Sequence, residues 1–494
     1  MSRLYKYVII RNQIHSLCWI SDTYPEGIVL LEAPKIVIAG ASGYIGRAII
    51  PKLLERFPNA EITALSRSAK KSDDLRVKWK VCDLFSHHSL ETVIPSKVDL
   101  AFYLVHSMGP TAHLDQGSFA DYDLLLADNF ARVIRKQGIQ HLIYLGGLIP
   151  KNGSMSLHLK SRLEVEETFA LYRLPITVFR AGLIVGENGS SFQILLKLVK
   201  RIPIMICPNW TQTLTTPVDL STVLSALVSA SLNPLHLQKT YDLAGCKPLT
   251  YINMMRETAS QMGKKRFFFT IPFFTPTLSR LWVSLITNSP KNLVYPLIQS
   301  LQHPMVARDC HLYDDESLKR SYSDLLKNTV LKTQPGKALF HFQPSRKTVR
   351  SVQRLVLPHS KNAEWIKFRY LEWLPRFLKP FIKVNLDGNF VVFSVFKRNW
   401  IMLQLEFSSS CSDIDTQILY IIKGLIVAEN NRGRLEFRVV LNRRYVIAAI
   451  HDYCPALPWF IYQQIQARIH LFVMRSFGKE LELNFKDSSD SLNL

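Results

Sequence analysis

The stretch KIVIAGASGYIGRAII, residues 35–50, decides the fold of the first half of the chain. A β-branched run leads into three glycines in the spacing G-x-x-G-x-x-G, and a helical pattern follows. The first glycine permits a tight turn, the second lets the backbone approach a pyrophosphate, and the third lets helix and strand pack closely. This context predicts a dinucleotide-binding loop rather than a turn that merely needs small residues. The loop residues expected at the cofactor are Gly40, Ser42, Gly43, Tyr44, Ile45 and Gly46.

Short β-branched runs alternate with helical patterns from Lys35 to about Gly245. This alternation is typical of βαβ units around a parallel sheet. Helices are expected over 45–57 and 121–138, the second with Gly138 at a left-handed end. The expected strands are KIVIAG (35–40), EITALS (61–66), VDLAFYLV (98–105), HLIYLG (141–146) and PITVFRA (175–181). The pattern predicts an α/β fold with a Rossmann-type, doubly wound parallel sheet.

The end of the second expected strand bears on which nicotinamide cofactor binds. In NAD-preferring sites an Asp or Glu about twenty residues after the loop binds the ribose 2′-hydroxyl. Here that strand ends in Ser66 and Arg67, without a carboxylate. Because arginine can pair bidentately with a 2′-phosphate, NADP(H) is predicted in preference to NAD(H), although an exposed loop arginine is the alternative reading. Asp83 and Leu84, in VCDLF, are expected on the adenine side.

The pattern changes after about residue 345 to that of an antiparallel sheet. Two joins between strand-like runs are only a few residues long, at 397–399 and 442–444. In GRLEFRVVL the apolar side chains share one face, and Glu436 and Arg438 share the other, so one face is expected to be dry. The strand-like runs are NFVVFSVF (389–396), WIMLQLEF (400–407), TQILYIIKGLIV (416–427), GRLEFRVVL (433–441) and RYVIAAIHDY (444–453).

The closing segment PWFIYQQIQARIHLFVMRSFG, 458–478, is expected to cover the dry face as a long helix that ends at Gly478. A sheet that grips such a helix commonly encloses an apolar cavity. The second half is therefore predicted to be an α+β helix-grip domain. Its covering arc is expected to consist of Ile461, Ile465, Ile469, Phe472 and Val473.

Composition narrows the functional classes. A chain of 494 residues that is 47% apolar is too long for one ordinary core and too hydrophobic to be disordered. Its seven scattered cysteines, without a C-x-x-C pair, indicate a reducing compartment and neither a disulfide framework nor a metal site. The net charge of +22 is spread over short runs, and no nucleic-acid module is recognisable. We expect a solvated basic surface in a cytoplasmic protein, with an anionic ligand or a peripheral membrane contact as the alternative.

Two segments are tested against membrane or export signals. Residues 1–34 are not expected to be a secretion signal, because Arg11 and Asn12 interrupt the apolar run; an extension is expected, and a start codon assigned too early is the alternative. Residues 267–287 are expected to be packed loop and helix, since prolines and Arg280 interrupt them.

The domains are expected at 1–34 (extension), 35–335 (Rossmann-type), 340–482 (helix-grip) and 483–494 (polar tail). The oligomeric state is left open.

Taken together, the motifs resemble the atypical short-chain dehydrogenase/reductase superfamily, in its NmrA-like NAD(P)H-binding group. The resemblance covers 35 to about 325 and rests on GASGYIG, LSRS, CDL, LVHSM, YLGGL, SLHLKSRLEVE and TVFRAGLIVG. LVHSM, YLGGL and SLHLKSR are similar to nucleoside-diphosphate-sugar epimerase-like proteins of bacteria. Some of these carry a C-terminal domain similar to START proteins, which VRSVQRLVLP, EWIKFRYLEWLPRF and GRLEFRVVL resemble.

The resemblance implies a Tyr-x-x-x-Lys pair on a helix and a serine at the preceding strand end. In SLHLKSRLEVE, His158 occupies the tyrosine position and Arg162 the lysine position, while Gly146 and Gly147 stand where the serine is expected. The arginine can still donate to ribose hydroxyls, but it cannot shuttle protons. A histidine with a pKa of about 6.5 could act as acid or base, and a structural histidine beside the cofactor is the alternative.

A substitute proton donor is expected at the end of the strand over 98–105. Ser107 and His106 follow that strand, at the edge where open α/β sheets bind ligands. Tyr103 and Tyr144 are further candidates, although strand tyrosines are more often core residues. His158, Arg162 and Ser107 are thus the candidate catalytic residues.

Three functions remain open on the sequence. The first is an NADP(H)-dependent oxidoreductase acting on a small, hydrophobic (quinone- or lipid-like) or sugar-nucleotide substrate. The second is a non-catalytic NADPH-binding redox sensor or assembly factor, which the loss of Tyr, Lys and Ser favours. The third is a lipid- or quinone-binding protein in which the helix-grip domain matters most.

Overall fold

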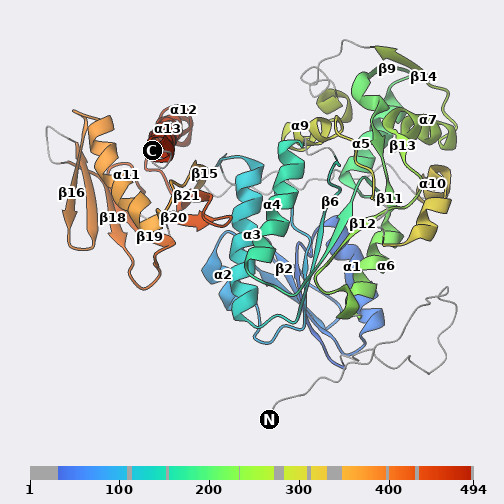
Figure 1. Ribbon diagram of the computed structural model, residues 1–494, viewed down its shortest axis with the longest axis horizontal. Coiled ribbons are helices and arrows are strands. Elements are labelled where there is room, and N and C mark those ends of the chain that lie inside the picture. The colour runs from blue at the N-terminus through green and yellow to red at the C-terminus, as the bar shows by residue number, and fades with distance from the viewer. Residues whose placement is uncertain are drawn as a thin grey trace.

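The computed structural model describes residues 32–107, 114–151, 155–232, 234–271, 283–308, 313–330, 348–395, 400–428 and 433–490. These residues form a parallel-sheet domain, a group of helices above it and an antiparallel-sheet domain to its side (Figure 1). Of the expected extension, 1–31 lie outside the described residues, as do 272–282 of the apolar stretch. In the part of the chain that the structure describes, no helix is both long and apolar enough to cross a membrane.

The first domain contains a seven-stranded sheet whose paired strands all run parallel, in the order β12-β7-β6-β4-β1-β2-β3. The five predicted strands are all present, and β3 and β12 complete the sheet. The chain leaves β1 toward β2 on one side and returns as β4 on the other, so the ligand crevice of such a sheet opens at the end of β1. The bounds are β1 Lys35–Ala39, β2 Glu61–Ser66, β3 Val77–Val81, β4 Leu100–Tyr103, β6 His141–Gly147, β7 Ile176–Ala181 and β12 Lys239–Leu243.

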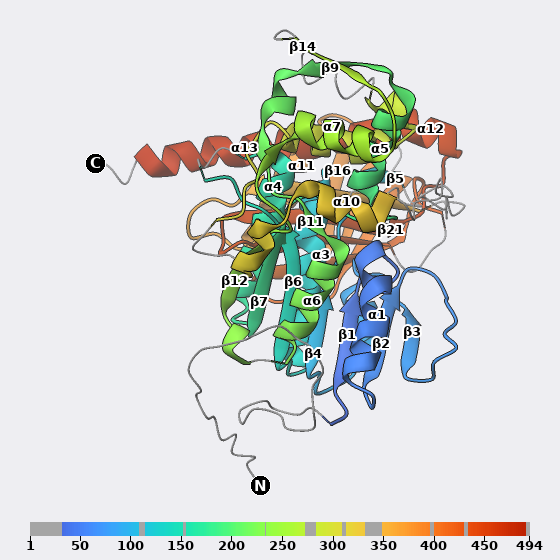
Figure 2. The same cartoon turned by 90° about the vertical axis from the view of Figure 1, so that its right-hand side faces the viewer.

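Helices cover both faces of this sheet (Figure 2). On one face lie α1 Tyr44–Arg56 and α6 Leu220–Ala230, and on the other α2 His87–Val93, α3 Phe119–Lys136 and α4 Leu157–Leu171. The helix predicted over 121–138 is α3, which begins earlier because Ser118 and Asp121 form a capping box. It ends at Lys136, and Gly138, two residues later, has a φ of +70° and makes the expected left-handed turn.

A group of helices and short strands lies above the ends of β6 and β7 and has its own apolar core (Figure 1). Its helices are α5 Ser190–Arg201, α7 Tyr251–Gln261, α9 Lys291–Ser300, α10 Tyr322–Val330, η1 Asn209–Gln212 and η4 Asp315–Lys319. The short helix η2 Pro234–His236 lies instead at the start of β7, where the carbonyl oxygen of His236 accepts from the hydroxyl of Thr177. The strands of the group are β8 Ile184–Val185, β9 Ile204–Pro208, β10 Leu214–Thr215, β11 Val218–Asp219, β13 Leu249–Thr250 and β14 Phe267–Ile271. This cap closes over the edge of the sheet where ligands are expected.

The second domain is a curved sheet with the order β16-β17-β18-β19-β20-β21-β15-β5. Its first seven strands are antiparallel, and the five predicted ones are confirmed. The last strand, β5, comes from the first half of the chain and pairs in parallel with β15. The bounds are β5 Leu114–Gln116, β15 Val349–Val356, β16 Ile382–Asp387, β17 Phe390–Val395, β18 Trp400–Phe407, β19 Thr416–Lys423, β20 Arg434–Val440 and β21 Tyr445–Tyr453.

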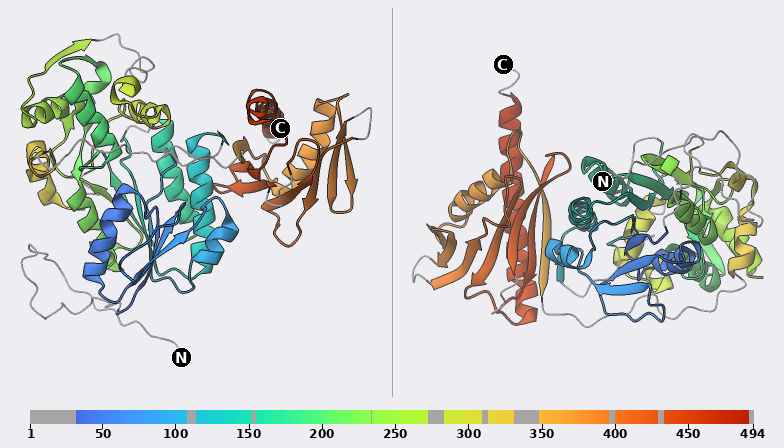
Figure 3. Two further views of the ribbon diagram at one scale, coloured as in Figure 1. Left: turned by 180° about the vertical axis from the view of Figure 1, so that it is seen from behind. Right: turned by 90° about the horizontal axis from the view of Figure 1, so that it is seen from below.

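Helices α11 Ala363–Phe377 and α13 Gln466–Asp490 cover the apolar face of this sheet, with the short α12 Trp459–Gln464 before α13 (Figure 3). The prediction of one helix ending at Gly478 is wrong at both points. The chain breaks at Ile465, and α13 continues to Asp490. No left-handed turn stops it, because Gly478 lies inside the helix and does not have a positive φ.

The face of α13 that packs on the sheet also differs from the prediction. Of the expected arc only Val473 is buried, whereas Ile469 and Phe472 are 54% and 61% exposed. The helix instead buries Phe477, whose ring lies 5.1 Å from that of Tyr370 on α11. Two apolar stripes compete on this helix, and the aromatic residues of α11 select the one that contains Phe477.

The opposite, charged face of the sheet is buried as well, against α3 and α4 of the first domain. Arg438 on β20 is 4% exposed and donates to Asp128 at 2.8 Å. Arg354 on β15 donates to Asp121 and Glu164, each at 2.8 Å. Apolar contacts surround these ion pairs and involve Tyr122, Leu124, Leu125, Val352, Val440, Leu441, Ile447 and Ala449. The alternating charges of GRLEFRVVL therefore form a domain interface and not a solvated surface.

Candidate functional site

The glycine loop is sterically restricted at its first and third glycines. Gly40 has a φ of +85°, and a Cβ there would lie 2.6 Å from the carbonyl oxygen of Leu104. A Cβ on Gly46 would lie 2.3 Å from the carbonyl oxygen of Gly40. Gly43 is exposed and is the N-cap of α1. The loop thus closes on itself and packs against the segment after β4.

The N-terminus of α1 suits an anion. No side chain caps the helix, and its first turn contains no acidic residue. Its first amides therefore remain available beside the positive end of the helix dipole, which is the arrangement that binds a diphosphate. Ser42 and Ile45 are half-buried, and the hydroxyl of Tyr44 is packed against Gly186, where burial raises its pKa to about 12. The loop fits a dinucleotide.

The residues expected around the adenosine part of the cofactor differ in their exposure and in their hydrogen-bond partners. Arg67 is exposed, whereas Ser66 is buried and accepts a hydrogen bond from the amide of Ser68 at 3.4 Å. The carboxylate of Asp83 accepts from Arg350 of the second domain at 2.7 Å. The carbonyl oxygen of Leu84 accepts from Asn129 at 2.9 Å. Contacts of Arg67 with a 2′-phosphate and of Asp83 and Leu84 with adenine remain predictions.

Arg162 is buried, at 5% exposure, in an ion pair that the sequence did not suggest. It donates to Asp123 on α3 at 2.7 Å and to the carbonyl oxygen of Val105 at 3.1 Å. Asp123 also accepts from the amide of Ser107 at 2.9 Å and from the hydroxyl of Ser161 at 3.0 Å. Although burial alone would raise it, Arg162 and His106 hold the pKa of Asp123 far below its usual value. The pair ties α3, α4 and the loop after β4 together.

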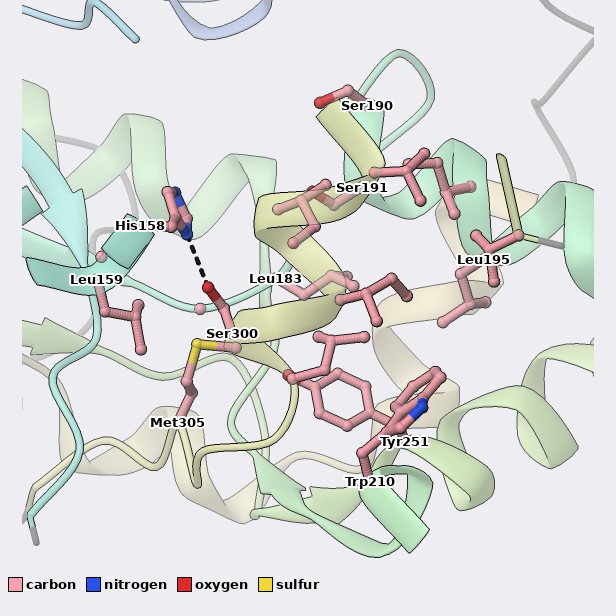
Figure 4. Close-up of a pocket in the computed structure, with 18 of the residues that line it drawn as sticks. His158, Leu159, Leu183, Ser190, Ser191, Leu195, Trp210, Tyr251, Ser300 and Met305 are labelled. Carbon is pink, nitrogen blue, oxygen red and sulfur yellow. Dashed lines mark hydrogen bonds between the residues drawn. The ribbon is translucent and has the colours of Figure 1, made fainter. Parts of the chain in front are cut away.

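A chain of polar side chains leads from Asp123 into the protein. Nδ1 of His106 lies 3.2 Å from Asp123 Oδ2, and its Nε2 lies 2.9 Å from Nε2 of His158. Nδ1 of His158 lies 2.9 Å from the hydroxyl of Ser300 on α9 (Figure 4). That hydroxyl lies 2.8 Å from the hydroxyl of Ser156. We call Asp123, His106, His158, Ser300 and Ser156 the histidine relay.

Both imidazoles of the relay are neutral at pH 7. Burial lowers the pKa of His158 well below its usual value, and the nearby His106 and Arg162 lower it further. Burial and Arg162 likewise lower the pKa of His106. One set of tautomers agrees with the hydrogen bonds of the chain: Nε2 of His106 donates to Nε2 of His158, Nδ1 of His158 donates to Ser300, and Ser300 donates to the carbonyl oxygen of Pro296 at 3.0 Å. Nδ1 of His106 then carries no hydrogen and lies beside the carboxylate of Asp123, with no hydrogen-bond partner among the described residues.

The relay reaches the wall of an apolar cavity of about 250 Å³ between the cap and the ends of β6 and β7 (Figure 4). We call it the histidine cavity. His106, His158 and Ser300 are on its wall, and no charged residue is among the lining residues that the structure describes. Gly147 also lines it, and a Cβ there would lie 3.6 Å from Arg162 Cγ, an ordinary contact. The apolar part of the wall includes Leu183, Ile194, Leu195, Leu198, Trp210, Tyr251, Met255, Ile298 and Met305.

The remaining candidates have structural contacts. The hydroxyl of Ser107 donates to the carbonyl oxygen of Phe119 at 2.9 Å. Tyr103 and Tyr144 are buried in the strands, with ring centroids 6.0 Å apart. Sequence reasoning missed Asp123 and Ser300. An acidic residue inside the apolar run DYDLLLADNF was a usable signal for Asp123, whereas Ser300 had none.

The comparisons with known proteins concern the first domain. Residues 36–155 match the NAD dependent epimerase/dehydratase family. This segment holds the glycine loop, Arg67, His106 and Asp123, and it ends just before His158. The first domain thus contains a match to an NAD dependent epimerase/dehydratase family over these residues, in agreement with the resemblance.

A curated relative matches over a similar length. Auxiliary protein GraX of Staphylococcus aureus (strain NCTC 8325 / PS 47) is 32% identical over 116 residues, which is 23% of this chain and 36% of the relative. The match thus spans only about a third of the relative's length.

Solved structures resemble the first part of the chain at low identity. Triphenylmethane reductase of Citrobacter sp. is 17% identical, with 60% of this chain and 99% of that chain covered and a TM-score of 0.47. NADPH-dependent quinone oxidoreductase QOR2 of Escherichia coli is 16% identical, with coverages of 59% and 99% and a TM-score of 0.47. A nucleoside-diphosphate-sugar epimerase of Staphylococcus aureus is 12% identical, with coverages of 62% and 98% and a TM-score of 0.44. These scores support no conclusion about substrate, and the START-like character of the second domain stays a prediction.

Proposed function

We propose that the protein is an NAD(P)H-dependent oxidoreductase that reduces an uncharged, largely apolar molecule of the quinone or carbonyl kind. The observation that carries the proposal is the histidine relay, which ends in the wall of a largely apolar cavity. The glycine loop and the relay share one segment, because Gly40 packs on Leu104 and His106 follows two residues later. The cofactor loop and the relay are therefore neighbours.

The lining of the histidine cavity selects among the substrate classes. A sugar nucleotide would bring a charged diphosphate, and burying such a charge without a partner is very costly. Among its described lining residues the cavity offers no Lys or Arg to such a diphosphate. It instead offers leucine, isoleucine and aromatic side chains, the polar corner of the relay, and the uncharged Ser190 and Ser191 elsewhere on the wall. This composition favours an apolar molecule with a single reducible oxygen in that corner.

The cofactor would be held by the glycine loop, with Arg67 at the 2′-phosphate of NADP(H), and when bound it supplies the hydride. The hydroxyl of Ser300 would turn from the carbonyl oxygen of Pro296 to the substrate oxygen, which gains negative charge during reduction, while Nδ1 of His158 donates to Ser300. Neutral donors in a dry site stabilise such charge, and a neutral imidazole suits this role. The oxygen then takes one proton from the hydroxyl of Ser300. Nδ1 of His158 returns a proton to Ser300, Nε2 of His106 returns one to Nε2 of His158, and Nδ1 of His106 takes one from solvent, so that one hydride and one proton are added in all.

Arg162 and Asp123 position the relay. Their ion pair fixes the carboxylate that lies 3.2 Å from Nδ1 of His106, and this holds both imidazoles in place. A buried carboxylate also stabilises a proton that moves onto the histidines. The arginine at the expected lysine position thus acts through Asp123, and a contact with the nicotinamide ribose stays a prediction.

The test is NADPH oxidation by purified full-length protein with 1,4-naphthoquinone or decanal, followed by the loss of NADPH absorbance. We expect His158→Phe to lower kcat about a hundredfold, the usual size of a general acid–base contribution, while NADPH affinity is kept. His88→Phe, at an exposed histidine, is the matched control. Equal rates in the two variants, or no oxidation with any acceptor, would overturn the proposal.

The second candidate is a dinucleotide-binding protein without chemistry. It is favoured by one observation, that the side chain of Arg162 is committed to Asp123 and Val105. It predicts tight NADPH binding together with no oxidation by any acceptor. The same assay therefore separates the two candidates.

A further inference from the structure

A second apolar cavity, of about 350 Å³, lies in the C-terminal domain between the sheet and the helices α11 and α13. We call it the sheet cavity. Its volume is within the range of small-molecule sites. Its described lining residues include no Asp, Glu, Lys or Arg. The apolar part of the wall includes Leu374, Phe393, Met402, Leu405, Ile421, Leu435, Ile450 and Val473.

One end of the sheet cavity is polar. Gln116 on β5 is paired in register with Ser351 on β15, and the hydroxyl of Ser351 lies 3.2 Å from Nε2 of His470 on α13. Gln466 lies one turn before His470 on the same helix. All four side chains line the cavity. Residues from both halves of the chain therefore converge at this end.

The hydrogen bonds around this end fix the orientation of both glutamine amides. The Gln116 amide nitrogen donates to the carbonyl oxygen of Ala467 at 2.8 Å. The Gln466 amide nitrogen donates to the hydroxyl of Tyr453 at 2.5 Å, and that hydroxyl donates to the carbonyl oxygen of Ile426. Both amide oxygens are consequently left buried, with no hydrogen-bond partner among the described residues.

Buried acceptors without a donor are costly, by about 1–3 kcal/mol each. A ligand that brings a donor would remove this cost, whereas a carboxylate would place its charge against two carbonyl oxygens. His470 cannot offset that charge, because burial lowers its pKa to about 4 and leaves it neutral at pH 7. An ammonium ion would meet no carboxylate on the described wall.

We propose that the sheet cavity binds an uncharged apolar molecule whose polar end is a hydrogen-bond donor, such as a hydroxyl group. The tail lies among the aliphatic and aromatic residues of the sheet, and the donor meets the oxygens of Gln116 and Gln466. Ile465 and Ile469 line the cavity while being 53% and 54% exposed, so the way in lies beside them. This site is separate from the histidine cavity and does not depend on nucleotide binding.

The experiment is calorimetric titration of the full-length protein at pH 7 with ligands of one chain length and different ends. We expect 1-decanol to bind at least tenfold more tightly than decanoate or decyl methyl ether, which lack an uncharged donor. Gln116→Leu should weaken 1-decanol binding about fivefold and leave the ether unchanged. Equal or tighter binding of decanoate would overturn the proposal.

Two blocking variants assign the site. Ile465→Trp, at the exposed rim, should abolish 1-decanol binding, while Ile461→Trp on the neighbouring α12, which does not line the cavity, should not. Leu195→Trp fills the histidine cavity and should leave the titration unchanged. Binding that is lost in Leu195→Trp but kept in Ile465→Trp would place the ligand in the wrong cavity and refute the inference. Failure here leaves the NADPH oxidation assay unaffected.

Discussion

The two cavities of this protein are alike in their walls and differ in what stands behind their polar ends. Each has an apolar lining with no charged residue among its described residues. Behind the polar end of the histidine cavity lies the buried ion pair of Asp123 and Arg162, whereas the sheet cavity ends in amides and a neutral histidine. A buried charge can stabilise a moving proton, but amide oxygens can only select a ligand by hydrogen bonding. The first site is thus equipped for chemistry and the second for binding.

The mutation with the largest expected effect tests whether the buried ion pair behind the histidine cavity stabilises the fold. Asp123→Ala should lower the free energy of unfolding by about 3–5 kcal/mol, because it leaves Arg162 charged and unpaired in the interior. Asp415→Ala, whose partner Arg443 is half-exposed, should cost about 1 kcal/mol or less. Denaturant unfolding followed by circular dichroism measures both. Equal losses would mean that the ion pair is not the distinguishing feature of this site.

The mutation with the next largest expected effect tests whether nucleotide binding concerns the histidine cavity and not the sheet cavity. In Gly46→Val the side chain would collide with the carbonyl oxygen of Gly40 and force the loop open. NADPH affinity should fall about a hundredfold, or roughly 2.7 kcal/mol. Titration of the same variant with 1-decanol is the internal control and should change less than twofold. Loss of both affinities would show that the variant disturbs the whole fold.

A mutation with a smaller expected effect tests which nicotinamide cofactor binds beside the histidine cavity. Arg67→Ala should weaken NADPH about tenfold, close to 1.4 kcal/mol, and leave NADH unchanged, because only NADPH carries the 2′-phosphate. Lys71→Ala, at an exposed lysine nearby, is the matched control. Fluorescence titration with both nucleotides gives the ratio. A parallel loss for NADPH and NADH would assign Arg67 to another role.

The smallest effect compares the neutral histidines of the two cavities. Burial lowers the pKa of His470 to about 4, while the unfolded chain has about 6.5. Below pH 6.5 the unfolded state binds the proton and the folded state does not, so stability falls as pH falls. Each such histidine should contribute about 1 kcal/mol of loss between pH 6.5 and 5.5. His470→Gln and His158→Gln should each flatten the pH dependence of unfolding, and an unchanged slope in either would contradict its burial as a neutral group.

Much of the first domain could be predicted because its signals are local. The five predicted strands, the glycine turn at Gly40 and the left-handed end at Gly138 all depend on residues close together in the sequence. The positions of His158 and Arg162 on one helix were likewise predictable from their spacing. Their partners were not, since Asp123 and Ser300 reach them from other helices.

In the second domain the sequence determined which apolar residues share a face of each strand or helix, and the tertiary structure decided which face is buried. Alternation in GRLEFRVVL separated the apolar side chains from Glu436 and Arg438, but only the docking on α3 shows that the charged face is buried too. The stripe containing Ile469 and Phe472 was visible in the sequence, yet α11 selects the stripe containing Phe477. A repeat along one chain fixes which residues share a face, whereas the partner of that face is brought from far away in the sequence. For this reason the glycine loop follows from the sequence, and the relay, the domain interface and both cavities follow only from the fold.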